Sequence, residues 1–161
     1  MGYTHYWQFK AIPKGKAASI ERKYKKALRD CQRIALAYHA ACKELDQADF
    51  GLSGYTAHTK VGQYGGLKIN GKGDLAHEDF IMREHYTQNL DPNLYFGFCK
   101  TARKPYDMVI TACLTVLKAA LGDLLIVNSD GGPSEWVRGV NYAETVLKRS
   151  FKCPVETDRA A

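Results

Sequence analysis

The sequence predicts an α+β fold: one small domain whose mixed sheet packs against a long N-terminal helix and a central apolar helix. Three observations lead to this class. Residues 3–10 have the aromatic composition of a strand, residues 18–46 repeat apolar side chains every three or four positions, and residues 106–121 are apolar on nearly every side. With 161 residues, 45% of them hydrophobic and 25% charged, the chain resembles one globular domain. We expect residues 1–154 to form it and residues 155–161 to fray.

The first element is the strand at residues 3–10, which Pro13 and Gly15 close. Alternate residues of a strand share a face, and here that face carries three aromatic rings and one imidazole: Tyr3, His5, Trp7 and Phe9. A histidine among large rings is usually a packing residue. The alternative is that His5 lines a pocket.

The long helix has a core face and a basic face. The expected core positions are Ile20, Tyr24, Leu28, Cys31, Ala35, Tyr38, Cys42 and Leu45, and the opposite side carries Arg22, Lys26, Arg29 and Arg33. Between Lys10 and Arg33 there are nine basic residues and two acidic ones, a local balance of +7, so this segment accounts for the whole net charge of +6. A solvated face is the commoner explanation. The alternative is contact with a host protein or a nucleic acid, although no nucleic-acid motif accompanies the stripe.

The remaining elements follow in order. Residues 51–66 have the composition of a loop, and Asn70-Gly71 predicts a turn in a hairpin made of residues 67–69 and 77–85. Another turn at residues 91–93 precedes a strand at 95–100. Pro105 suits the first turn of the helix at 106–121, residues 124–127 form a buried strand, and Ser134 is an expected N-cap for the last helix.

The cysteines indicate a reducing environment. Five are present, an odd number without a Cys-x-x-Cys pair, which favours a cytoplasmic protein. No N-terminal signal is expected, and the apolar run from Met108 to Leu121 is too short to span a bilayer. Lys100 and Arg103 could lower the pKa of the Cys99 thiol and make it reactive, but a structural role for Cys99 is favoured.

Residues 98–107 hold the densest cluster of groups that can bind a ligand. Three cations, a hydroxyl, a phenol and a carboxylate stand just before the central helix: Lys100, Thr101, Arg103, Lys104, Tyr106 and Asp107. Basic side chains at a helix start favour anions. The alternative is a solvated loop that precedes the helix.

Several familiar chemistries are not indicated. The chain has no P-loop sequence, no Gly-x-Ser-x-Gly elbow and no zinc-ligand spacing among its histidines. His77 and His85 flank three acidic residues, Glu78, Asp79 and Glu84, but a metal site there is a minor alternative, and we assign no metal ligand. No cofactor is assigned.

Four segments resemble a family of short, uncharacterised phage and bacterial proteins, the longest of them, residues 98–107, being written below in two halves. They are Gly2-Tyr3-Thr4-His5-Tyr6-Trp7, His77-Glu78-x-Phe80, Phe98-Cys99-Lys100-Thr101-Ala102, Arg103-Lys104-Pro105-Tyr106-Asp107 and Ser129-Asp130-Gly131. The resemblance covers most of the chain. It implies a phage or prophage setting, hence a host-cell cytoplasm, and no activity. The shared motifs include the polar residues His5, Glu78, Lys100, Thr101, Arg103, Lys104, Tyr106, Asp107 and Asp130, which could form a site or a buried network.

Two functions remain open at this level. In the first, the protein binds a small anionic ligand of the nucleotide or phosphate type, and hydrolyses it if a general base is in place. The expected ligand-binding residues are Lys100, Thr101, Arg103, Lys104, Tyr106, Asp107 and Trp7, and the expected catalytic residues are Glu78, Asp130 and His5. In the second, it is a non-enzymatic inhibitor of a host defence system that acts through its basic helix. A homo-oligomer is compatible with either.

Overall fold

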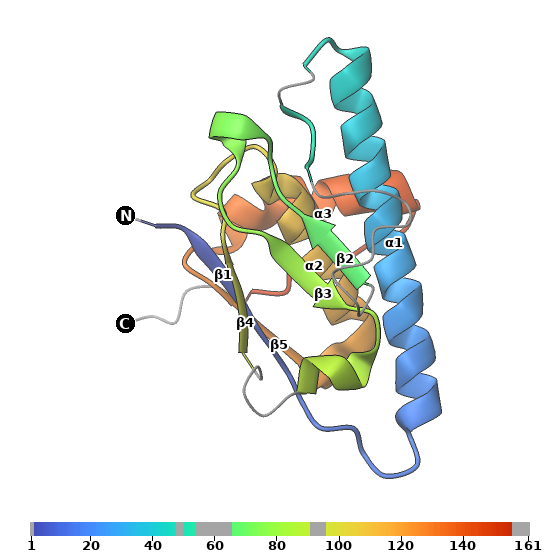
Figure 1. Ribbon diagram of the computed structural model, residues 1–161. Coiled ribbons are helices and arrows are strands. Elements are labelled where there is room, and N and C mark those ends of the chain that lie inside the picture. The colour runs from blue at the N-terminus through green and yellow to red at the C-terminus, as the bar shows by residue number, and fades with distance from the viewer. Residues whose placement is uncertain (1, 48–49, 54–65, 91–95, 156–161) are drawn as a thin grey trace.

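The computed structural model describes residues 2–47, 50–53, 66–90 and 96–155. Helices pack on small antiparallel sheets, so the expected α+β class is confirmed (Figure 1). The main elements are β1 (Thr4–Phe9), α1 (Ala17–Glu44), β2 (Gly66–Ile69), β3 (Phe80–Arg83), β4 (Phe96–Lys100), α2 (Asp107–Leu121), β5 (Leu125–Ser129) and α3 (Pro133–Leu147). Short 3₁₀ turns among the described residues include η2 (Gly73–Leu75), η3 (Tyr86–Leu90) and η4 (Gly122–Leu124).

The N-terminal strand is the centre of a three-stranded antiparallel sheet. Its neighbours are β4 and β5, which gives the strand order β4-β1-β5. His5 therefore lies between Cys99 of β4 and Ser129 of β5 in the strand register. This register brings three distant segments together at one end of the sheet: the start of β1, the end of β4 and the end of β5. The expected hairpin is a separate two-stranded ribbon, β2 with β3.

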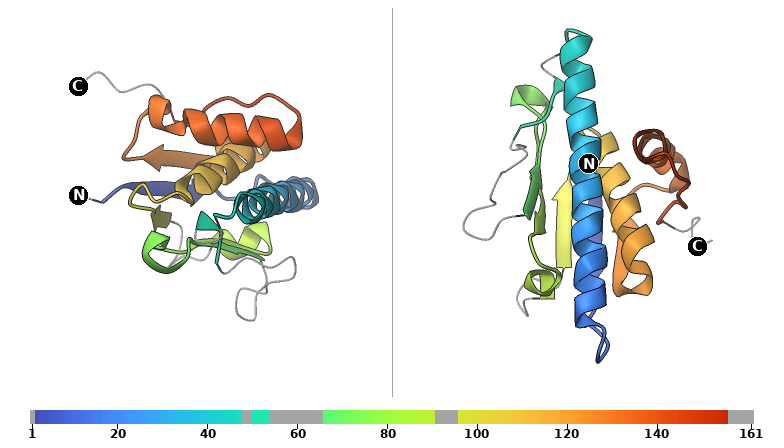
Figure 2. Two further views of the ribbon diagram at one scale, coloured as in Figure 1. Left: turned by 90° about the horizontal axis from the view of Figure 1, so that it is seen from above. Right: turned by 90° about the vertical axis from the view of Figure 1, so that its right-hand side faces the viewer.

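The next feature is how the helices and the β2–β3 ribbon are placed around α1. Seen along the length of α1, the helices α2 and α3 are on one side and the β2–β3 ribbon is on the other (Figure 2). The central helix is the most buried of the three, with ten buried residues in its 15 positions. A side chain on α3 at Gly139 would collide with Thr111, because a Cβ there would lie 2.0 Å from Thr111 Oγ1. Glycine thus permits the close packing of α3 on α2.

The core face of α1 is as expected over most of its length. Seven of the eight expected core residues are buried, among them Tyr24 and Cys31, which are fully enclosed. Leu45 is the exception, since it is 69% exposed. The helix ends at Glu44, so Leu45 no longer follows the helical periodicity that put it on the core face.

Three local expectations differ from the structure. The last helix starts at Pro133 with Gly132 as its N-cap, two residues before the expected cap at Ser134, because proline is favoured in a first turn. The central helix starts after Pro105, with Tyr106 as its N-cap. Val155, expected in the frayed tail, is buried. Most of the expected loop at 51–66, the turn at 91–93 and residues 156–161 lie outside the described residues.

Membrane insertion has no support in the described helices. None of them combines the length and the apolar character that a bilayer crossing requires.

Candidate functional site

His5 is the centre of a buried polar relay. It lies on β1 with none of its surface exposed, and each ring nitrogen contacts a side chain from a distant segment. Nε2 is 2.6 Å from Asp107 Oδ1, and Nδ1 is 2.9 Å from Ser129 Oγ. A carboxylate only accepts hydrogen bonds, so Nε2 carries a proton. In the neutral ring Nδ1 then accepts the hydrogen of the Ser129 hydroxyl.

Asp107 is the partly exposed member of this relay. Its Oδ1 also accepts a hydrogen bond of 2.5 Å from the hydroxyl of Thr101, which is fully buried. The Asp107 side chain itself is 17% exposed. The carboxylate is therefore held by two donors inside the protein while part of it stays accessible. Ser129 is fixed at the other end, because its oxygen accepts the N–H of Gly131 at 3.0 Å.

The loop before α2 has an unusual backbone that places Arg103. Ala102 and Arg103 both have positive φ, at 50° and 56°, a region that non-glycine residues rarely adopt. The Arg103 guanidinium lies over the Tyr3 ring, 4.2 Å from its centroid, and Nε donates to Glu135 Oε1 at 3.0 Å. Two consecutive left-handed residues are costly, and such strain is often retained at functional sites.

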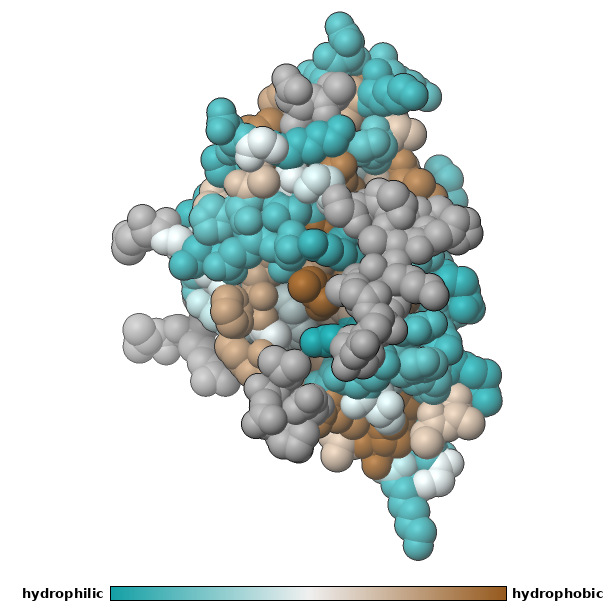
Figure 3. All heavy atoms as spheres, viewed as in Figure 1, coloured by the Kyte–Doolittle hydropathy of each residue, from teal (hydrophilic) through white to brown (hydrophobic). Residues whose placement is uncertain are grey.

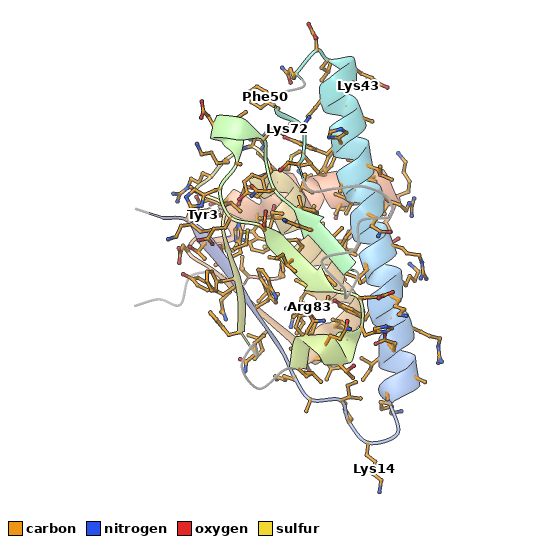
Figure 4. All side chains as sticks on the ribbon, viewed as in Figure 1. Tyr3, Lys14, Lys43, Phe50, Lys72 and Arg83 are labelled. Carbon is orange, nitrogen blue, oxygen red and sulfur yellow. The ribbon has the colours of Figure 1, made fainter. Side chains whose placement is uncertain are left out.

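A cavity of about 710 Å³ opens beside this loop, between α1, α2 and α3. That volume is within the range of small-molecule sites. Figure 4 labels two of its lining residues, Tyr3 at the start of the sheet and Phe50 beyond the end of α1. Four aromatic side chains line it, Tyr3, Tyr38, Phe50 and Tyr142, together with apolar side chains that include Met108 and Leu45.

The charges around the cavity leave a net positive balance. Three cations line it, Arg103, Lys104 and Arg138, against two carboxylates, Asp107 and Glu135. Glu135 is paired with Arg103, and the Lys104 ammonium donates to the backbone oxygen of Asp74 at 2.8 Å. Arg138 forms no ion pair within the described residues, so its full charge is available to a ligand.

Tyr3 presents a buried hydroxyl to this region. The side chain is 1% exposed, and within the described residues its hydroxyl forms no hydrogen bond of standard geometry, although the Ser129 hydroxyl is close enough to interact with it. Burial, and then the carboxylates of Asp107 and Glu135, raise the pKa of Tyr3 to about 12, although the nearby Ser129 hydroxyl and Arg103 lower it. The phenol therefore stays protonated at neutral pH. An unpaired buried donor is costly unless something pairs with it.

Several expected site residues lie in a second cluster, at the junction of β4 with the segment before β3. The Lys100 N–H donates to Glu78 Oε2 at 2.8 Å, and the Tyr106 hydroxyl donates to the Glu78 backbone oxygen at 2.8 Å. Neither Glu78, Lys100 nor Tyr106 lines the cavity. The Glu78 carboxylate is used to hold the two segments together. Burial raises the pKa of the Cys99 thiol to about 12, so the structure supports the structural role of Cys99.

Two other expected residues are also engaged elsewhere. Asp130 accepts the Thr4 N–H at 3.0 Å and the Tyr6 hydroxyl at 3.3 Å, which ties the end of β5 to β1. Trp7 is buried against Phe80 of β3, with ring centroids 5.1 Å apart. Of the expected site residues, the cavity is lined by Arg103, Lys104 and Asp107, while His5 and Thr101 stand directly behind Asp107. The remaining ones do not converge on it.

Some of the cations on the basic face of α1 form ion pairs within the protein, unlike those of a fully solvated stripe. The Asp30 side chain, 6% exposed, forms ion pairs with Lys26 at 3.1 Å, with Arg33 at 3.4 Å, and with Arg149, just after α3, at 2.9 Å. The Lys26 and Arg33 contacts have the i,i+4 and i,i+3 spacing of helix neighbours, but the sequence gives no sign of the third contact, since Arg149 is 119 residues from Asp30. Two of the four expected partner-binding cations are therefore occupied within the protein. This weakens the hypothesis that the stripe is an interaction surface.

Sequence reasoning missed a large part of the cavity. Tyr38 and Tyr142 form an edge-to-face pair with centroids 6.2 Å apart, and Arg138 and Glu135 stand on α3. Ser129 lies in a motif that the sequence singles out, but its contact with His5 required the β1–β5 register. The polar residues at the start of the last helix, such as Glu135, were the one sequence feature that could have indicated that α3 contributes to the cavity.

Comparison with known proteins adds no assignment: no family model, curated protein or solved structure matches the chain. Among the described residues, no three His, Cys, Asp or Glu side chains are grouped as a metal site requires. The His85 ring, considered above as a metal ligand, is 2.7 Å from a Glu21 carboxylate oxygen. A function can therefore be inferred only from the residues and the geometry of the cavity.

Proposed function

We propose that the protein binds a mononucleotide, or a ligand of the same kind with a phosphate group on a flat ring, in the cavity between α1, α2 and α3. The observation that carries this proposal is the lining. Two arginines, Arg103 and Arg138, and four aromatic residues line one cavity of about 710 Å³. Lys104 also lines it, but its ammonium donates to the Asp74 backbone oxygen. Cations complement a phosphate, and aromatic faces complement a flat ring.

Each part of the ligand has a natural location. Arg138 offers an unpaired guanidinium, and Arg103 adds a second one that is oriented by Tyr3 and Glu135. Guanidinium groups bind phosphate with two parallel hydrogen bonds. The ring would lie on the apolar and aromatic side, where Tyr38, Tyr142 and Met108 line the cavity.

Asp107 is the residue through which hydrolysis would proceed if the protein is an enzyme. It lines the cavity, and its carboxylate is held by His5 at 2.6 Å and Thr101 at 2.5 Å. A carboxylate held in this way can accept a proton from an attacking water. Glu78 and Asp130, whose carboxylates accept backbone N–H groups, are not placed for that role.

Isothermal titration calorimetry with AMP, GMP, CMP and UMP tests the proposal. At least one should bind, while the matching nucleoside, which lacks the phosphate, should bind much more weakly. Arg103→Ala combined with Arg138→Ala should weaken binding by roughly tenfold or more, because charged hydrogen bonds contribute about 1.5–3 kcal/mol each. Arg29→Ala, an exposed cation of α1 outside the cavity, is the matched control.

A second variant blocks the cavity without changing charge. Ala41 lines it from α1 and is exposed, so Ala41→Trp should fill the space and leave the fold intact. Binding that survives this change, or the absence of binding by all four mononucleotides at about 1 mM, would contradict the proposal.

The phage setting is an expectation from the sequence resemblance, and inhibition of a host defence system is the alternative hypothesis based on the basic helix. Neither of them identifies a residue that would contact the ligand.

A further inference from the structure

The outer face of the three-stranded sheet carries aromatic rings in a regular array. This face points away from α2, and the register sets its side chains in cross-strand rows. One row is Phe98, Tyr6 and Asn128, and the next is Phe96, Gln8 and Ile126. Neighbouring side chains in such rows lie about 5 Å apart across strands and about 7 Å apart along them.

The rings of this array are exposed and lie against one another. Phe96 is 53% and Phe98 is 55% exposed, values unusual for phenylalanine. Tyr6 stacks on Phe96 with centroids 5.5 Å apart, and Phe96 is 6.5 Å from Phe98. In Figure 3 apolar residues form a light brown patch over β4, bordered by hydrophilic residues. Contiguous exposed aromatic surface marks an interaction site.

The polar residues of the face fit a particular partner. Lys10 continues the outward row of β1 at one end, and Lys100 ends the row of β4 at the other. Neither ammonium has an ion pair within the described residues, so each is available to a phosphate. The facing acid, Asp130, is engaged by Thr4 and Tyr6. Asp79, on the adjoining β3 side, is paired with Lys68 at 3.2 Å.

We infer that this sheet face binds single-stranded RNA. Exposed rings provide stacking surfaces for unpaired bases, and a lysine at each end meets the backbone. Between them, the exposed amides of Gln8 and Asn128 offer donors and acceptors to a 2′-hydroxyl, the group that distinguishes RNA from DNA. An apolar peptide or a second copy of the chain would bury the rings but would not need the flanking lysines. The site is separate from the helix cavity.

Fluorescence anisotropy with a labelled 12-nucleotide oligouridylate tests the inference. Phe96→Ala and Phe98→Ala should each weaken binding by roughly tenfold, the effect of losing one stacked base. Val137→Ala, on the exposed side of α3 and 50% exposed, is the matched control and should bind as the wild type does. Lys10→Gln with Lys100→Gln should reduce the salt dependence, log Kd against log salt, by roughly 1.4, the value for two phosphate contacts on a single strand.

The outcomes that overturn the inference are distinct. The first is no binding of oligouridylate, or binding that the phenylalanine variants leave unchanged. The second is equal or tighter binding of the matching oligothymidylate. The third is a dimer in sedimentation velocity that Phe96→Ala converts to a monomer, which would assign the face to a second copy. Ala41→Trp should leave RNA binding unchanged, so that this test is independent of the mononucleotide proposal.

Discussion

Replacing His5 by phenylalanine tests whether the relay holds the sheet to the central helix. The phenyl ring is somewhat larger than the imidazole, and it can keep the edge-to-face contacts with Tyr3 and Trp136, both at 5.0 Å. The two hydrogen bonds are lost. The bond to the Asp107 carboxylate is charge-assisted and contributes about 2 kcal/mol, and the bond to Ser129 contributes about 1 kcal/mol. We therefore expect a loss of about 3 kcal/mol in the free energy of unfolding.

Thermal and urea unfolding measure this loss. For a chain of 161 residues, about 3 kcal/mol corresponds to a fall of about 9 °C in Tm. Ser129→Ala, which removes only the weaker contact of the relay and the Gly131 contact, should lower the free energy of unfolding by about 1–2 kcal/mol. Val137→Ala should change it by less than about 0.5 kcal/mol. If His5→Phe costs less than about 1 kcal/mol, the relay does not stabilise the fold as argued.

Three further outcomes follow from the packing. One thiol, Cys153, should react quickly with Ellman's reagent in the native protein, because the other four cysteines are buried; rapid release of two or more equivalents would contradict this. Gly139→Ala should lower the free energy of unfolding by about 1–3 kcal/mol through its clash with Thr111, whereas an unchanged Tm would show that α3 shifts freely. Asp30→Asn should cost about 1–2 kcal/mol at pH 7. Burial alone would raise the pKa of Asp30, but hydrogen bonds from Arg149 and Lys26 hold it below its usual value. The contribution is thus present above the unfolded pKa of about 4 and is lost as pH falls through the folded pKa, so the stabilities of wild type and variant should converge there; a difference that persists would refute it.

The elements of the fold could be predicted because each depends on a local pattern. The alternation of residues 3–9 gave β1, and the three- and four-residue repeat from Ile20 to Cys42 gave the core face of α1. The apolar character of residues 107–121 gave the buried central helix. The errors, such as Leu45 and the start of α3, occur at element ends, where one cap residue decides the boundary.

The site could be predicted only in part, because it depends on register and on helix packing. The cluster at 98–107 contains Arg103, Lys104 and Asp107, which line the cavity. No local pattern shows that Lys100 donates its N–H to Glu78, or that Arg138 and Tyr142 complete the cavity wall. Those contacts arise when β4 pairs with β1 and when α3 packs across α2.

The central claim is that a phosphate-bearing ligand occupies the cavity between the three helices. Amide NMR titration with AMP tests it most directly, because it locates the ligand whether or not a reaction follows. The account predicts that the perturbed amides cluster at residues 38–47, 103–111 and 135–142, the cavity segments, and that Arg138→Ala reduces the shifts. Perturbations confined to β1 and β4, or none at millimolar AMP, would contradict it.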